Sequence, residues 1–276
     1  MTKAIDISHL SKRFSTKRGS TLVLDDISLS IAPGEFLTIV GASGCGKSTL
    51  LRIIAGLETS DSGSVHVGSK AVCGPGVDRA MVFQDYSLFP WMTVKRNVLF
   101  SRRLAANNHD KLARQRGAEH ERALRLISLV GLSAVQDSYP SQLSGGMRQR
   151  VAIARALMSK PSIILMDEPF GALDAQTREV MQDLVLSVVA QEGTTIVFVT
   201  HDVEEALYLG SRVVLMSPHP GRIDTIYDVP MDRDRNVMMR VDPRFVALKR
   251  MVMDRVRETV GLSLDKSAME NNLVEA

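Results

Sequence analysis

Cysteine and net charge are both scarce in this sequence of 276 residues. Two cysteines, Cys45 and Cys73, cannot form a disulfide framework, so we expect a chain that folds in a reducing compartment. Lysine and arginine (34) exceed aspartate and glutamate (31) by 3, a surplus too small to indicate nucleic-acid binding by charge. We therefore expect no nucleic-acid partner.

Long apolar runs are also missing. No stretch approaches the roughly 18 uninterrupted apolar residues of a membrane span, and the first six residues lack the apolar core of a signal peptide. Hydrophobic residues at 45% and charged residues at 24% are ordinary for a globular protein and exclude wholesale disorder. These absences predict a cytoplasmic, globular chain, long enough for one large or two modest domains.

The apolar patterns predict strands that alternate with helices. Runs with the length of buried strands lie at 36–40, 163–166, 195–200 and 213–216. Such alternation is typical of a parallel sheet covered by helices on both faces, an α/β fold. Before the third run, we expect one helix to present Val180 and Met181, with their neighbours a turn further on, on a single apolar face.

A mostly helical insert is predicted between about 94 and 157. Within it, Ala123, Leu126, Ile127 and Val130 recur at helical spacing. We divide the chain into a domain at 1–230, which contains this insert, and a C-terminal helical tail at 231–276.

The tail is expected to form a helix after Pro243. Phe245, Leu248, Val252 and Val256 fall on one stripe of this helix, and basic residues flank the stripe. The helix would lie either on a membrane surface or against the body of the protein. We favour packing against the body, because a short helix with one apolar stripe usually faces a core. Residues after about 264 are expected to fray.

A phosphate-binding loop is predicted at 41–48, where GASGCGKS matches the pattern G-x-x-x-x-G-K-[ST]. An apolar strand precedes it and a helix follows. The glycines let successive backbone N–H groups turn toward phosphate oxygens, aided by the positive end of the helix. Lys47 would reach the β- and γ-phosphates, and the Ser48 hydroxyl would ligate Mg²⁺. The predicted nucleotide-binding residues are Gly41, Ala42, Ser43, Gly44, Cys45, Gly46, Lys47, Ser48 and Thr49.

Cys45 lies inside this loop at a helix N-terminus, a position that stabilises a thiolate. We therefore expect alkylation of this thiol to block nucleotide binding, and bound nucleotide to protect the thiol.

Two acids end a second apolar run, in the segment SIILMDEP at 162–169. A buried strand with this pattern delivers carboxylates to the C-terminal edge of a sheet, where α/β proteins bind ligands. Asp167 would hold Mg²⁺ through a water, and Glu168 would polarise a water that attacks the γ-phosphate. Alone, such a pair is more often a helix cap or a surface feature. Beside a phosphate loop in the same chain, the catalytic interpretation is favoured.

The segment LSGGMRQR at 143–150 completes a set of motifs whose order resembles the nucleotide-binding domain of ATP-binding cassette (ABC) proteins. The resemblance covers about residues 3–225 and implies a P-loop NTPase (RecA-like) core with an antiparallel β subdomain and a helical signature subdomain. It implies that Ser144, Gly145 and Gly146 bind the γ-phosphate of ATP held by the opposite subunit. The family usually has glutamine where Met147 stands.

The same resemblance implies four further roles. Gln84 would sense Mg²⁺ and the attacking water, and His201 would contact the γ-phosphate. Asp174 would couple the two sites of the dimer, although the family more often has serine where Gly171 stands. Phe14 would stack on adenine, but packing of this ring in the core is an equal alternative.

One phosphate loop and one signature cannot build a finished site in one chain if the signature serves the partner. The resemblance therefore implies a homodimer that closes head to tail on two ATP molecules. In the transporter branch of the family, the region after Gln84 receives a helix of an integral membrane permease. Phe89 and Trp91 would line that groove, anchor the helical insert, or do both.

Pro90, Trp91 and Asn97, together with Met147, are similar to the importer branch that serves nitrate, sulfonates and taurine. This similarity implies an ATPase at the cytoplasmic face of the cell membrane, with a permease as partner and a periplasmic or extracellular solute-binding protein as an indirect one. A soluble ABC ATPase of DNA repair or translation is the alternative. A P-loop kinase is a third interpretation, but it would leave Ser144, Gly145 and His201 without a role.

Overall fold

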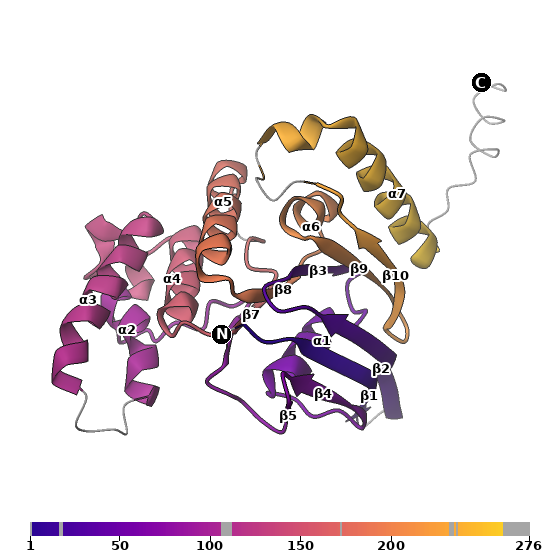
Figure 1. Ribbon diagram of the computed structural model, residues 1–276, viewed down its shortest axis with the longest axis horizontal. Helices are drawn as coiled ribbons and strands as arrows, with labels where there is room; N and C mark the ends of the chain where they lie inside the picture. Colours follow the sequence, from indigo (N-terminus) through magenta and orange to yellow (C-terminus); the bar gives the residue numbers. More distant parts are fainter. Residues whose placement is uncertain are drawn as a thin grey trace.

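The structure, a computed structural model, describes residues 2–16, 19–105, 112–171, 173–231, 235 and 237–261. Strands in this part of the chain form two sheets (Figure 1). The smaller sheet is antiparallel, and its strands in spatial order are β2 (Gly19–Ile31), β1 (Ile5–Thr16), β4 (Ser62–Val67) and β5 (Lys70–Ala71). In the larger sheet the order is β10 (Arg222–Asp228), β9 (Arg212–Ser217), β3 (Phe36–Gly41), β8 (Thr195–Val199), β7 (Ile163–Asp167) and β6 (Arg79–Val82).

The larger sheet is parallel except at β10, which pairs antiparallel with β9. Every residue of β3, β7 and β8 is buried, as expected for strands that are covered on both faces. Successive side chains of β7 point to opposite sides. Ile163 and Leu165 enter the core shared with α1 (Lys47–Ala55), whereas Ile164 and Met166 enter the core shared with α4 (Gly145–Met158) and α5 (Ala175–Glu192).

Helix α1 lies between the two sheets (Figure 1). It packs against β1, β2 and β4 on one side and against the larger sheet on the other. The helix that follows the predicted phosphate loop is therefore fixed by two apolar surfaces at once. This packing places the start of α1 rigidly at the edge of the larger sheet.

In the described part of the stretch where the sequence predicts an insert, most residues are helical, and the helices lie together on one side of the molecule (Figure 1). Ala123, Ile127 and Val130 are buried there, as their spacing predicts. The elements are α2 (Val94–Ala105), α3 (Leu112–Leu129), two short 3₁₀ turns (Ser133–Val135 and Pro140–Gln142) and α4 (Gly145–Met158).

One expectation about α5 (Ala175–Glu192) is wrong. Met181 and Val185 are buried in the core, but Val180 is 67% exposed. The core side of α5 is narrower than the sequence suggests, and Val180 falls just outside it.

The tail packs against the body, as expected. Phe245 and Val252 of α7 (Pro243–Thr259) are fully buried against α6 (Val203–Leu209) and β9. Leu248 and Val256 are partly buried in the same cluster. A short 3₁₀ helix, η3 (Val237–Val241), leads into α7, and the Asp242 carboxylate caps α7 by accepting from the backbone N–H of Arg244 at 2.8 Å. Residues after 264 lie outside the described part of the chain.

Candidate nucleotide site

The predicted site residues follow strands that end at one edge of the larger sheet. Asp167 at the end of β7 pairs with Val199 of β8, and Val82 of β6 pairs with Met166. β3 runs parallel to β8 and leads directly into the predicted phosphate loop. The loops after β3, β6, β7 and β8 therefore meet at the carboxyl edge, where open α/β sheets bind ligands.

The phosphate loop has the backbone that its glycines were expected to allow. Gly44 (φ +80°) and Gly46 (φ +94°) adopt left-handed conformations, and Gly46 directly precedes α1. A Cβ atom on Gly46 would lie 2.6 Å from Leu24, and one on Gly41 would lie 2.5 Å from the carbonyl oxygen of Met216. A side chain is thus excluded at Gly46 by both the backbone conformation and the neighbours, and at Gly41 by the close approach of Met216.

Lys47 is buried, and its ammonium faces the loop. Its Nζ donates to the carbonyl oxygens of Gly41 at 2.8 Å and Ala42 at 2.9 Å, and lies 3.8 Å from the Cys45 sulfur. These carbonyl partners carry no charge, and in the part of the chain that the structure describes no carboxylate accepts a hydrogen bond from the Lys47 ammonium. A group that brings negative charge into the loop fits this arrangement.

Ser48 and Asp167 meet across the start of α1. The Ser48 hydroxyl donates to Asp167 Oδ1 at 2.8 Å. Burial raises the pKa of Asp167, while the bond from Ser48 opposes this shift. Hydroxyl and carboxylate oxygens are the ligands that Mg²⁺ prefers, and this ion is usually held by one or two carboxylates together with substrate phosphates. In the described ranges no three His, Cys, Asp or Glu side chains are grouped so that they could hold a metal ion, so Ser48 and Asp167 fit a Mg²⁺ ion whose other ligands are phosphate oxygens and water.

Glu168 and His201 face each other from adjacent loops. Glu168 Oε2 and His201 Nδ1 lie 3.2 Å apart. Glu168 has a left-handed backbone (φ +45°), and its N–H donates to the carbonyl of Val199 at 3.0 Å. The hydrogen bonding of the sheet thus extends one residue beyond β7 and fixes the backbone of Glu168. Gln84 is exposed just after β6 and, among the residues described, makes no hydrogen bond to these groups.

The signature segment opens a helix, as expected. Ser144 is the N-cap of α4, and its hydroxyl accepts from the backbone N–H of Met147 at 3.2 Å. Met147 itself is partly buried in the core of the helical insert. Within one chain, and as far as the structure describes it, Ser144, Gly145 and Gly146 make no hydrogen bond to the phosphate loop.

Asp174 and Phe14 lie at the periphery of this arrangement. The Asp174 carboxylate accepts from the backbone N–H of Thr177 at 2.9 Å, and this bond lowers the pKa of Asp174. It therefore caps α5. Phe14 is 36% exposed on β1, with Lys12 Nζ 5.0 Å from its ring centre. The roles of both residues toward nucleotide stay predictions.

The expectation of a reactive Cys45 is wrong for this structure. Its side chain is fully buried. Burial raises the pKa of the Cys45 thiol, and the nearby Lys47 ammonium only partly offsets this effect. The N-terminus of α1 does not lower the pKa of the Cys45 thiol below its ordinary value, because the sulfur is enclosed in the apolar core beneath the loop.

Sequence reasoning missed Gly221 as part of the site. A Cβ atom on Gly221 would lie 2.1 Å from the carbonyl oxygen of Cys45 and 2.9 Å from that of Val23. Because Gly221 has no side chain, the turn between β9 and β10 can pack directly against the backbone of the phosphate loop. The glycine was visible in the sequence, but only the fold shows what approaches it.

Two further side chains brace the segment after Gln84. Asn97 is fully buried and hydrogen-bonds the backbone of Phe89 and the carbonyls of Met92 and Thr93. Arg155 of α4 donates to the carbonyls of Tyr86 and Ser87 at 3.1 and 2.7 Å. The segment is thereby tied to the helix that begins with the signature.

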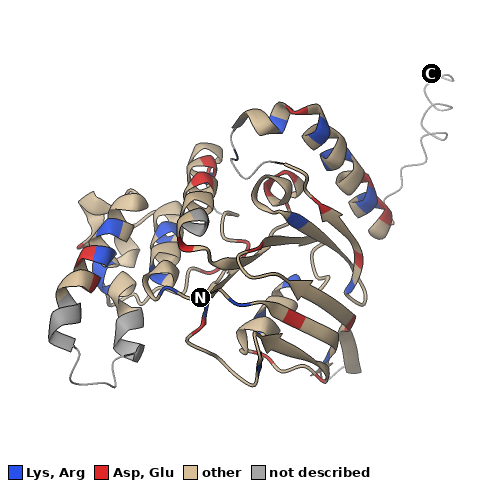
Figure 2. Ribbon diagram, in the orientation of Figure 1, with Lys and Arg blue, Asp and Glu red and all other residues tan. Residues whose placement is uncertain are grey.

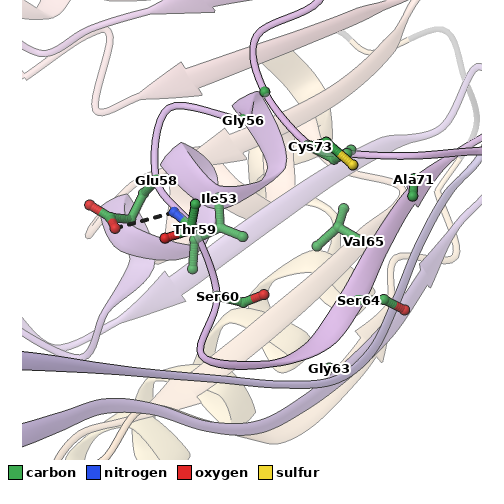
Figure 3. Close-up of a pocket in the computed structure, with 12 residues that line it drawn as sticks. Ile53, Gly56, Glu58, Thr59, Ser60, Gly63, Ser64, Val65, Ala71 and Cys73 are labelled. Carbon is green, nitrogen blue, oxygen red and sulfur yellow. Dashed lines mark hydrogen bonds between the residues drawn. The ribbon is translucent and has the colours of Figure 1, made fainter.

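A pocket of about 260 Å³ lies elsewhere, between the end of α1 and strands β4 and β5 (Figure 3). Its wall includes Ile53, Glu58, Ser64 and Cys73, and no predicted site residue lines it. The pocket is therefore separate from the nucleotide site.

Comparisons with known proteins agree with this site. The model of the ABC transporter family matches residues 24–171. The aliphatic sulfonates import ATP-binding protein SsuB of Bacillus subtilis is 42% identical over 94% of this chain and 96% of its own. The nitrate import ATP-binding protein NrtD of Synechocystis is 44% identical over 87% and 90%, and the taurine import ATP-binding protein TauB of Chromobacterium violaceum is 46% identical over 83% and 87%.

Among solved structures, the ATP-binding cassette MJ0796 is similar to this chain. Its dimeric structure in a post-hydrolysis state, bound to ADP and Pi, superposes with a TM-score of 0.74 at 31% identity, over 83% of this chain and 100% of that one. The match confirms the fold class expected from the sequence.

Proposed function

Because this chain belongs to the ABC transporter family of ATP-binding proteins, we propose that it is the ATPase subunit of an importer that works with a separate membrane permease. The chain hydrolyses ATP, and the hydrolysis is coupled to transport. The observation that carries the proposal is the meeting of the phosphate loop with Asp167 and with the Glu168–His201 pair at one sheet edge.

Each of the residues at this sheet edge has a separate role in ATP hydrolysis. The Lys47 ammonium exchanges its loop carbonyls for phosphate oxygens, while the Ser48 hydroxyl and Asp167 carboxylate would hold Mg²⁺. When bound, the ion neutralises charge on the β- and γ-phosphates. Glu168 Oε2 accepts a proton from the attacking water, and His201 keeps that carboxylate oriented and contacts the γ-phosphate. Gln84, which follows the neighbouring strand β6, would interact with Mg²⁺ and with the attacking water.

The working unit of this proposal is a homodimer. Ser144, Gly145 and Gly146 form a helix N-terminus that makes no hydrogen bond to the phosphate loop of its own chain, as far as the structure describes it. Two copies arranged head to tail bring each helix end to the γ-phosphate held by the other. Asp174 then lies between the two sites, and Phe14 stacks on the adenine.

The cargo is a small solute of the nitrate, sulfonate or taurine kind, by the names of the relatives. No described helix is both long and apolar enough to cross a bilayer. In the proposed assembly the permease supplies the channel, this chain lies at the cytoplasmic face of the membrane, and a solute-binding protein delivers the cargo from the other side.

Purification from membranes tests this proposal. We expect the chain to retain an integral membrane partner in mild detergent, and its ATPase activity to rise when the solute-binding protein and the right solute are added. ATPase activity stimulated by DNA, with no membrane partner, would instead support a soluble ABC ATPase. The Lys47→Ala variant, purified in the same way, controls for contaminating ATPases.

A further inference from the structure

One arginine of the C-terminal tail contacts both helices that follow the site loops. Arg240 of η3 donates to Glu179 Oε1 and to Gln182 Oε1 of α5, each at 2.8 Å. It also lies 3.7 Å from Glu204 of α6, and its guanidinium sits 4.7 Å from the ring centre of Tyr208. Acidic residues on α5 and α6 and basic residues of the overlying tail are visible in Figure 2. Arg240 therefore joins three elements at one point.

A buried chain of polar groups continues from Gln182 toward the site. The Gln182 side chain is buried, and its amide donates to Glu205 Oε1 at 3.0 Å. Glu205 is also buried; burial raises the pKa of its carboxyl, and the nearby Thr200 hydroxyl opposes this shift. The Thr200 hydroxyl in turn accepts from the backbone N–H of Asp202 at 3.1 Å. This chain ends on the two residues that flank His201.

A second link between the same helices supports this path. Arg178 of α5 donates to the carbonyl oxygen of Leu173, which directly precedes Asp174, at 3.2 Å. Its other guanidinium nitrogen lies 3.8 Å from Asp202, the N-cap of α6. The loop that precedes α5 and the loop that carries His201 are thus fixed to each other at their near ends, whereas Arg240 fixes their helices further along.

We propose that Arg240 is a positioning residue for ATP hydrolysis, which acts through Gln182 and Glu205 to hold His201 against Glu168. The physical reason is that buried polar groups must keep their partners, so Gln182 and Glu205 have few alternative arrangements. Without the Arg240 side chain, the Gln182 side-chain carbonyl loses its charged donor. The polar side chains from Gln182 to Thr200 can then take other positions. The inference rests on the proposed role of His201.

The Arg240→Met variant tests it, because methionine keeps the length and apolar contact of the side chain and removes the hydrogen bonds. Arg250→Met is the matched control, since Arg250 lies on the outer side of α7 with its side chain 80% exposed. We expect Arg240→Met to lower kcat for Mg-ATP by about fivefold, by analogy with small misplacements of catalytic groups. KM should stay within about a factor of two, because Arg240 has no bond to the phosphate loop in the described part of the chain. Arg250→Met should match the wild type in both constants.

A double-mutant cycle separates positioning from simple loss of stability. In a His201→Ala background, measured with enzyme in excess over ATP, Arg240→Met should cause no further fall in rate. An equal fall in both backgrounds, or a kcat equal to that of Arg250→Met, would overturn the inference. If thermal unfolding shows that the Arg240→Met variant is not folded, the Gln182→Met variant is measured in its place and judged by the same criteria. A wild-type chain with no ATPase activity would instead contradict the proposed function.

Discussion

At the scale of single residues, the position of Lys47 favours the binding of an anion in the phosphate loop. Its ammonium rests on two carbonyls of its own loop and is already buried. Phosphate therefore meets a cation that has lost most of its water and that, among the described residues, has no carboxylate bonded to it. The desolvation of this charge is a cost of folding and not of nucleotide binding.

We expect Lys47→Ala to weaken ATP binding or turnover by about 100-fold or more, the scale of losing one preorganised charge in a site. The same variant should keep its fold, since the hydrogen bonds that the structure describes for the Lys47 ammonium are all to its own loop. Lys70→Ala, at an exposed strand position, serves as the control. Fluorescent-nucleotide titration and ATPase assays measure both effects, and a Lys47→Ala variant with wild-type activity would contradict the role of this residue.

The two cysteines should differ in reactivity. Cys45 is buried and its thiol pKa is raised, whereas Cys73 is exposed. We therefore expect a thiol reagent to modify Cys73 in the native protein and to reach Cys45 only on unfolding. Mass spectrometry of the time course distinguishes the sites. Modification of Cys45 as fast as Cys73 would show that the loop opens readily.

At this scale, the sequence predicts the residues of the phosphate loop because the pattern is local. The strand, the glycines and the helix start follow one another directly. Gly221 could not be predicted in the same way, because the reason for it is an approach by the carbonyl of Cys45 from a distant part of the chain. The burial that reverses the expected behaviour of Cys45 is likewise a property of the packed core.

At the scale of elements, the buried strands could be predicted well. β3, β7 and β8 are short apolar runs because both faces of the sheet are covered. The core side of α5 was harder to predict, since Val180 and Met181 are adjacent and both apolar, yet only Met181 is buried. The polar chain from Arg240 to Thr200 has no local pattern at all.

Asn97 is expected to hold the segment between β6 and α2. Asn97→Leu removes the polar partners of four backbone groups and should lower the free energy of unfolding by about 2–4 kcal/mol. Arg96→Leu, an exposed change one residue earlier in the same helix, should have a small effect. Denaturant unfolding measures both, and equal stabilities of the two variants would contradict this bracing role.

At the scale of the whole molecule, the fold brings the phosphate loop and the residues predicted to act with it together. The signature segment lies outside this group. The phosphate loop, Asp167, Glu168 and His201 share one sheet edge. The signature instead starts α4 in the helical insert, on another side of the chain (Figure 1). The sequence alone indicates this division only through the resemblance to a family, because no periodicity reveals which surface a second copy would meet.

The central claim is that two copies complete each other's sites around ATP. The most direct measurement is the mass of the Glu168→Gln variant in saturating Mg-ATP, by light scattering after size-exclusion chromatography. This change keeps the shape of the side chain and removes the base, so bound ATP persists. We predict the mass of two chains with Mg-ATP and of one chain without it or with Lys47→Ala added. A Glu168→Gln chain that binds Mg-ATP yet stays monomeric would contradict the claim.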